Sequence, residues 1–223
     1  MVWVSGSDFS GLNAQNLLFI VLSGIATGAS WLCYYRALSL ADVSQVVPID
    51  KLSTFLTMIF AFIIFHEEVT PLKILCMLMM MFGTYLMISK PKQKATSNHW
   101  YLYALGSAFF ASLTAILAKI GIINVDSQTV TALRTIVVVM MAWLVVRVSH
   151  SYQPLSMIHK KQAFFIVLSG VATGLSWLCY FEALKDGPAS VVVPIDKLSI
   201  VISILFAYFI LHEKSKSKDF RLV

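Results

Sequence analysis

Charged residues are scarce in this sequence, and their scarcity limits what the protein can be. Only 13% of the 223 residues are Asp, Glu, Lys or Arg, whereas soluble domains carry about 25%. In contrast, 58% are hydrophobic and the mean hydropathy is +0.80, so there is too little polar material to cover a water-soluble surface. These figures exclude an ordinary cytosolic enzyme, a disordered tail and a secreted disulfide scaffold, and they leave a polytopic membrane protein.

Cysteine and catalytic motifs are scarce as well. The three cysteines, Cys33, Cys76 and Cys179, all lie in apolar runs and predict no disulfide framework. No nucleophile-plus-base array, zinc ligand set or phosphate-binding glycine loop is present, so we expect no enzyme, no metal and no cofactor. The net charge of +6 is carried by short connections between apolar runs. It therefore indicates basic loops of a membrane protein rather than a nucleic-acid site.

Apolar runs long enough to cross a membrane occur seven times. A spanning helix needs about 20 mostly apolar residues, and continuous rather than alternating runs favour helices over membrane strands. Short polar connections make neighbouring helices antiparallel. The sequence thus predicts an all-α polytopic membrane bundle of about seven transmembrane helices, at residues 17–38, 44–65, 71–89, 100–122, 127–146, 163–184 and 189–211.

Lysine and arginine are distributed unevenly between the two sides of these spans, and basic loops mark the cytoplasmic side. The side with the first, third and fifth connections and the C-terminus carries Arg36, Lys90, Lys92, Lys94, Arg147, Lys160, Lys161, Lys214, Lys216, Lys218 and Arg221. The other side carries Lys73, Lys119 and Lys185. We therefore predict an outside N-terminus and a cytoplasmic C-terminus, in a membrane of the bacterial plasma-membrane type.

An internal repeat relates residues 19–67 to residues 165–213. Roughly 30 of about 50 aligned positions are identical, including IVLSG at Ile20 and Ile166 and VVPIDKLS at Val46 and Val192. Three predicted helices lie between the copies, so the repeating unit has five helices and its second copy crosses the membrane in the opposite direction. Such inverted repeats are typical of secondary transporters.

Two five-helix units need ten helices, whereas seven are predicted. The first copy would lack its first two helices and the second copy its fifth. We therefore expect either a fragment of a longer product or a chain that assembles with another chain.

Several of these motifs resemble the EamA-like family of the drug/metabolite transporter superfamily. They are AILAKIG at Ala115, TALRT around Arg134, SGxATG at Ser23 and Ser169, WLCY at Trp31 and Trp177, and VPIDKLS at Val47 and Val193. The resemblance implies an incomplete inverted five-helix repeat. Residues 1–94 would be the last three helices of the first EamA repeat, and residues 95–223 the first four helices of the second.

Charged residues inside the spans are expensive and mark candidate functional positions. Asp50 and Lys51 lie in one copy, and Asp196 and Lys197 in the other. Each pair is about six residues from its helix start, or roughly 10 Å below the membrane surface. Because the two helices enter from opposite faces, the pairs should flank the midplane, where repeat interfaces hold substrate and ion sites.

Adjacent helical residues point about 100° apart, so Asp50 and Lys51 are not expected to pair with each other. Arg134 and Lys119, which also lie in spans, are candidate partners on neighbouring helices. These charges could form a substrate and ion pathway. They could instead form structural ion pairs that fix the packing of the bundle.

Pro48 and Pro194 precede the charged pairs by two residues. If the helices start near Ser44 and Ser190, each proline lies in a first turn and costs little. An earlier start would free a carbonyl and kink a discontinuous, substrate-binding helix. The helix-start interpretation is favoured.

Small and hydroxyl residues recur in the first span and in its copy. The GxxxG spacing lets helix backbones approach closely, which favours helix packing over lining of a cavity. The residues are Ser23, Gly24, Thr27, Gly28 and Ser30, with Ser169, Gly170, Thr173, Gly174 and Ser176 in the copy.

Aromatic residues lie at the ends of the same spans: Trp31 and Tyr34, with Trp177 and Tyr180 in the copy. Interfacial belts are the usual role of such residues. Stacking against a solute amine is the alternative.

The sequence thus predicts a transporter, or part of one, that moves a small polar organic metabolite or drug-like solute by alternating access, and protons could drive it. Its partners would be the lipid bilayer, the solute and, in a homo-oligomer, further copies. The alternative is a truncated or non-transporting membrane subunit that needs a partner chain.

Overall fold

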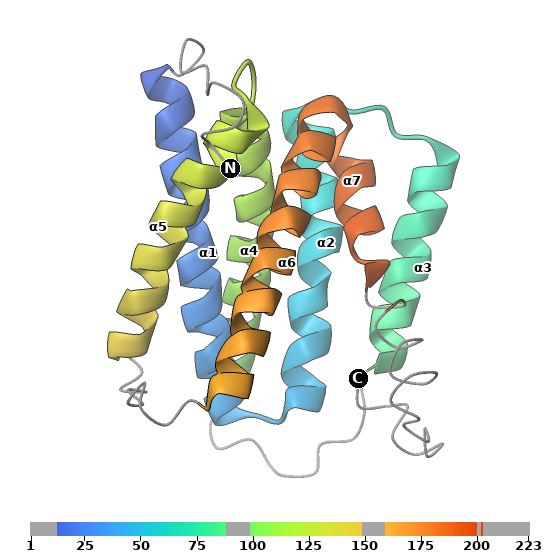
Figure 1. The fold of residues 1–223 in the computed structure, drawn as a ribbon. Coiled ribbons are helices and arrows are strands. Elements are labelled where there is room, and N and C mark those ends of the chain that lie inside the picture. The colour runs from blue at the N-terminus through green and yellow to red at the C-terminus, as the bar shows by residue number, and fades with distance from the viewer. Residues whose placement is uncertain (1–12, 88–98, 149–158, 200–201, 203–223) are drawn as a thin grey trace. The chain divides into compact units, whose positions relative to one another are not determined.

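The structure is a computed structural model that describes residues 13–87, 99–148, 159–199 and 202. Seven helices and no strand occur among these residues (Figure 1). The helices are α1 (Ala14–Leu40), α2 (Val43–Ile64), α3 (Pro71–Met87), α4 (Trp100–Gly121), α5 (Ser127–Val148), α6 (Lys160–Asp186) and α7 (Ala189–Asp196).

Five of these helices, α1, α2, α4, α5 and α6, are long and apolar enough to cross a membrane. The prediction of an all-α, polytopic membrane bundle is therefore confirmed. The apolar helix α3 is shorter, with 17 residues. Much of the predicted orientation depends on basic residues that lie outside the described residues. They are Lys90, Lys92, Lys94, Lys214, Lys216, Lys218 and Arg221.

The seventh predicted span, 189–211, begins as expected but does not continue unbroken. Helix α7 ends at Asp196, and the Lys197 N–H donates to the carbonyls of Pro194 and Ile195 instead of closing a regular helical turn. Helical bonding returns where the Ile202 N–H donates to the Leu198 carbonyl. The part of this span that the structure describes is therefore a discontinuous helix.

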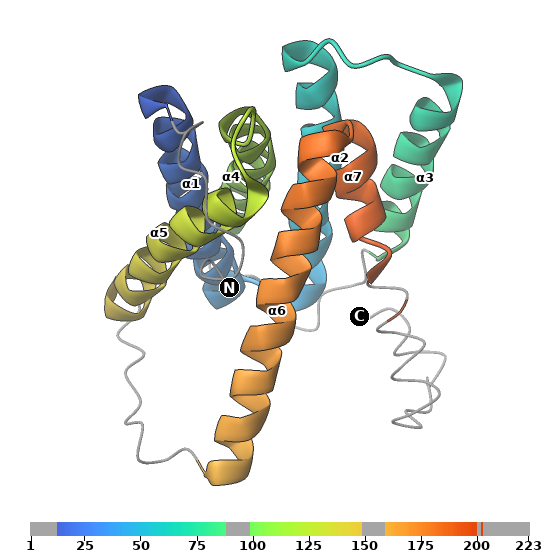
Figure 2. The same cartoon turned by 45° about the horizontal axis from the view of Figure 1, so that its top comes forward.

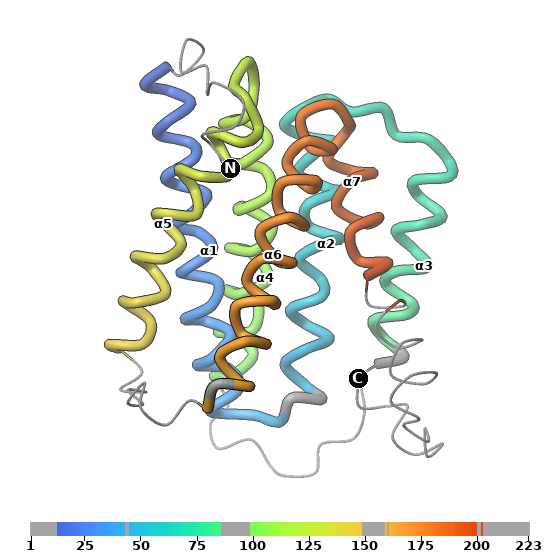
Figure 3. Tube along the Cα trace, viewed as in Figure 1, coloured from blue at the N-terminus to red at the C-terminus, as the bar shows by residue number. Residues whose placement is uncertain are grey.

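The two copies of the repeat start the same elements at the same places. Helices α1 and α6 are each 27 residues long and begin at equivalent residues, Ala14 and Lys160. Helices α2 and α7 also begin at equivalent residues, Val43 and Ala189. Figure 3 shows that α2 and α7 run in opposite directions, and the two helices are in contact. This pair displays the inverted orientation that the repeat predicts.

The helix-start interpretation of the two prolines is wrong. Pro48 lies inside α2, which begins at Val43, and Pro194 lies inside α7, which begins at Ala189. Each proline is thus past the first turn, where its missing N–H leaves one carbonyl without a helical donor. In α2 the helix continues to Ile64, whereas α7 ends two residues after its proline.

Two compact units make up the chain. One contains residues 1–28 and 117–187, and the other contains residues 29–116 and 188–223. In the first unit α5 packs against α6 and against the start of α1. In the second unit α2 packs against both α3 and α7 (Figure 2), and Ala37, Val46 and Ala104 form a fully buried core.

Candidate functional site

Arg134 of α5 is the most enclosed charged residue among those described, with 5% of its surface exposed. Its Nε donates to Ser23 Oγ at 3.2 Å, and its Nη2 donates to Thr27 Oγ1 at 2.8 Å. The guanidinium carbon lies 4.4 Å from the centre of the Trp177 ring and 5.2 Å from that of Phe181. Hydroxyls from α1 and aromatic rings from α6 therefore surround this cation.

The Arg134 cluster lacks a negative charge. Within its unit, no described carboxylate forms an ion pair with Arg134. Placing an arginine at the centre of a membrane helix costs about 2.5–3.5 kcal/mol on insertion scales. Hydroxyl acceptors and a cation–π contact with a tryptophan recover part of this cost. The site is therefore a buried cation held by neutral groups.

Close packing between α1 and α5 fixes the cluster. A Cβ added to Gly24 would lie 2.6 Å from Val137 Cγ1, and one added to Gly28 would lie 2.7 Å from Met141 Cβ. Only glycine allows α5 to approach this closely. These contacts support the packing role favoured for this motif, in the α1 copy.

Asp50 belongs to a polar chain in the other unit that links three helices. Ser107 Oγ on α4 donates to Asp50 Oδ1 on α2 at 2.7 Å, and Ser30 Oγ on α1 donates to the Ser107 carbonyl at 3.1 Å. Asp50 is half-buried, whereas Ser30 and Ser107 are buried. Lys51 is half-buried and forms no ion pair with any described carboxylate of its unit.

Asp196 and Lys197 behave differently from their copies. Lys197 Nζ donates to Asp196 Oδ2 at 2.9 Å, and the side chains are 37–39% exposed. Asp50 and Lys51, for which no such pair is expected, form none among the described residues, so the two copies differ. The reason is that α7 ends at Asp196, so Lys197 is free of the 100° helical step that separates neighbouring side chains.

Lys119 caps a helix rather than meeting a carboxylate. Its Nζ donates to the carbonyls of Leu184 and Gly187 at the C-terminal end of α6. A cation there neutralises the negative end of the helix dipole and binds carbonyls that have no helical donor. Nearby, Ser127 Oγ donates to Glu182 Oε2. Both contacts fasten α6 to its unit.

Glu67 caps the N-terminal end of a helix, at the start of α7. Its Oε1 accepts from the Ala189 N–H at 2.7 Å, and its Oε2 accepts from the Ser190 N–H at 3.0 Å. A carboxylate at a helix N-terminus satisfies free donors and the positive end of the dipole. The α7 helix is thus held by a residue from the first copy of the repeat.

The remaining predicted residues fall into two groups. Trp31 is exposed and Tyr34 is half-buried in α1, whereas Trp177 and Tyr180 are both half-buried in α6. The Trp177 ring stacks on Phe181 with centroids 5.5 Å apart and its centre lies 4.4 Å from the Arg134 guanidinium carbon, so Trp177 does not face lipid alone. The whole small-residue set of α6 is exposed: Ser169, Gly170, Thr173, Gly174 and Ser176.

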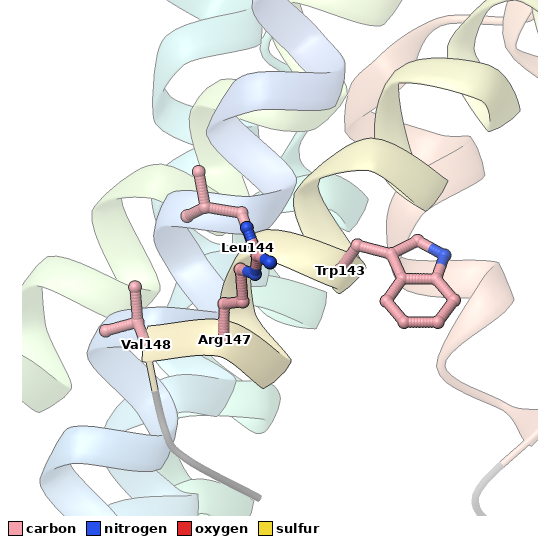
Figure 4. A pocket seen from close by; sticks show the side chains of 4 residues that line it. All are labelled: Trp143, Leu144, Arg147 and Val148. Carbon is pink, nitrogen blue, oxygen red and sulfur yellow. The ribbon is translucent and has the colours of Figure 1, made fainter. Parts of the chain in front are cut away.

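A shallow hollow lies at the C-terminal end of α5. It is lined by Trp143, Leu144, Arg147 and Val148, all from one helix (Figure 4). A tryptophan and an arginine at a span end are typical of a membrane boundary, so the hollow has no feature of a built binding site. No group of three potential metal-ligating residues occurs among the described residues.

Three contributors to these arrangements are not among the candidate site residues that the sequence indicates: Ser107, Phe181 and Glu67. A lone serine in an apolar helix carries no signal of its own. Phe181 follows the WLCY motif by one residue, and its role depends on how α5 lies. Glu67 is part of the repeated His-Glu pair at a span end, where a solvated residue is the usual interpretation.

Comparison with known proteins identifies the family. The sequence pattern of the EamA-like transporter family matches residues 1–89 and 98–222. A protein of a Sinorhizobium species, described as an uncharacterized transporter in the cobO 3′ region, is 44% identical over 118 residues, which is 53% of this chain and 84% of that protein. Family, relative and apolar helices agree: the chain belongs to the EamA-like transporter family, whose members are transporters that cross the membrane several times.

Proposed function

We propose that the protein moves a small polar organic solute across the membrane by alternating access of two inverted repeats, within residues 1–94 and 95–223. One observation carries the proposal. One copy of the VPIDKLS motif lies inside α2 and the other spans the end of α7, and these two helices run in opposite directions and pack against each other. Inverted repeats that meet at charged helices, of which α7 is interrupted here, are typical of transporters that work by alternating access.

The local geometry suggests how such a site could operate. Asp50 Oδ1 accepts a bond from Ser107, which leaves its second oxygen for a proton or a solute donor. In α7 the backbone turns away from the helix directly after Asp196, and such breaks supply free carbonyls for binding. We propose that Asp50 and Asp196 couple solute movement to protons, and that the N-terminus lies outside and the C-terminus in the cytoplasm.

Uptake by purified protein in proteoliposomes tests the proposal. A panel of amino acids, amines, organic acids and sugars identifies the solute, and a pH gradient tests the coupling. Asp50→Asn and Asp196→Asn should each reduce uptake at least tenfold and flatten its dependence on the gradient. Asp186→Asn, which changes an exposed residue at a span end, should leave both unchanged. Intact uptake and pH dependence in both Asn variants would contradict the coupling.

A second function is favoured by the open face of α6. Gly170 and Gly174 have no atom within 4 Å of an added Cβ, and exposed small-residue faces suit contact with another membrane helix. The chain could therefore be a non-transporting subunit. In that case the purified chain alone would transport no member of the panel, and uptake would appear only with a second membrane chain.

A further inference from the structure

We propose that Arg134 binds a carboxylate group of the transported solute. This inference rests on the proposed function and deepens it, because it assigns a chemical class to the solute. The site is the guanidinium together with the residues that hold it: Ser23 and Thr27 of α1 and Trp177 and Phe181 of α6. All of them lie in one compact unit of the chain.

The hydrogen-bonding capacity of Arg134 is only partly used. A guanidinium has five N–H donors in a planar fork. Two of them are bonded, one on Nε to Ser23 and one on Nη2 to Thr27. The other three bond to no described residue of the unit. These three donors form the free edge of the guanidinium, and we place the carboxylate there.

The charge of Arg134 is also unused. Ser23 and Thr27 are neutral acceptors, and the unit offers Arg134 no described ion pair. Lys119, the other enclosed cation of the unit, differs because the carbonyl groups at the end of α6 surround its ammonium. Of these two cations, Arg134 is therefore the one that we expect to bind an anionic group.

The surroundings favour a carboxylate in particular. A carboxylate presents two oxygens in a plane, which matches the guanidinium fork in a bidentate pair. It also carries one negative charge and neutralises one arginine, whereas a phosphate dianion would need a second cation. The Trp177 and Phe181 rings, stacked at 27° and 5.5 Å, exclude water beside the guanidinium, and a charge pair is stronger where water is excluded.

Trp177 supplies a reporter that does not require transport, because its ring lies 4.4 Å from the guanidinium carbon. The full chain, with Trp3, Trp31, Trp100 and Trp143 replaced by Phe, is titrated in detergent with benzoate, benzamide, propionate, propionamide and inorganic phosphate. We expect saturable changes of Trp177 fluorescence, with each carboxylate binding at least tenfold more tightly than its amide. Equal affinities for acid and amide, or tighter binding of phosphate, would overturn the proposal.

Variants separate binding from folding. Arg134→Gln should abolish the preference for the acid, and Arg134→Lys, which keeps the charge without the fork, should reduce it about tenfold. Lys119→Gln, a matched removal of the other cation, should keep it. If Arg134→Gln does not elute as a folded species, Arg134→Lys decides: an unchanged acid preference in that folded variant would refute the bidentate site.

Different outcomes would contradict the proposed function and this inference. Acid-selective binding without uptake of any carboxylate in proteoliposomes would refute transport and uphold the site. Uptake of carboxylate solutes that Arg134→Lys and Arg134→Gln leave unchanged would refute the site and uphold transport.

Discussion

Helices α1 and α6 share more than half of their residues and have the same length, yet only α1 has its small-residue face covered. Around Gly24 and Gly28 the side chains of Val137 and Met141 leave no room for a Cβ, whereas Gly170 and Gly174 face open space. Ser23 and Thr27 bind Arg134, whereas Ser169 and Thr173 are exposed. Similar sequences therefore form similar helices, but the helix packed against the small-residue face determines whether that face is buried and which contacts it makes.

In the second pair of copies, α2 and α7, equivalent charged residues also make different contacts. Asp50 lies in a continuous helix and is held by Ser107 from α4. Asp196 lies at a helix end and is held by its own neighbour, Lys197. One motif thus makes a long-range contact in one copy and a local one in the other.

The largest expected difference between the copies concerns glycine. Gly24→Leu would force α1 and α5 apart because Val137 is β-branched and cannot move aside easily. We expect a loss of about 3 kcal/mol in the free energy of unfolding, measured by equilibrium denaturation in mixed micelles. Gly170→Leu, the matched change in α6, should cost nothing or stabilise slightly, because leucine is the better helix former. Equal losses would mean that the α6 face is covered in the folded protein.

A smaller difference should separate the two threonines. Thr27→Val keeps the shape of the side chain but removes the acceptor of the Arg134 Nη2 bond. Loss of a bond to a charged donor should cost about 1.5–3 kcal/mol, read in the same denaturation experiment. Thr173→Val should stay within about 0.5 kcal/mol. A larger effect of Thr173→Val would contradict the difference between the copies, because it would show that the Thr173 hydroxyl has a hydrogen-bond partner in the folded protein.

The smallest difference should appear at the two aspartates. Ser107→Ala removes the donor to half-buried Asp50 and should cost about 1 kcal/mol. Lys197→Gln removes an ion pair whose side chains are 37–39% exposed, and exposed pairs contribute about 0–1 kcal/mol. Thermal unfolding of both variants beside the native chain measures the order. A greater loss for Lys197→Gln would show that the α7 pair is shielded from solvent.

Much of the fold could be predicted from the sequence. The starts of α3, α4, α5 and α7 lie where the apolar runs begin, because an apolar helix in a membrane must satisfy its own backbone. The inverted direction of α2 and α7 also follows from the repeat. The interruption after Asp196 could not be predicted, since VPIDKLS is identical in α2 and there continues as helix.

The candidate site was predictable only as a set of unusual residues. The sequence identified Arg134, Lys119 and the small-residue motif, because charge and glycine are rare in spans. It could not assign their contacts. Carbonyls of α6 bind Lys119, and hydroxyls with two rings surround Arg134, and these partners lie far from each cation along the chain.

The amino-acid sequence is sufficient to predict the helical class, the membrane as solvent and the family. These depend on composition and periodicity, which are properties of consecutive residues. Contacts between helices set which copy of each motif is covered, which cation retains free donors and where α7 breaks. Those features depend on which helix lies beside which, and identical motifs acquire different roles when the groups across from them differ.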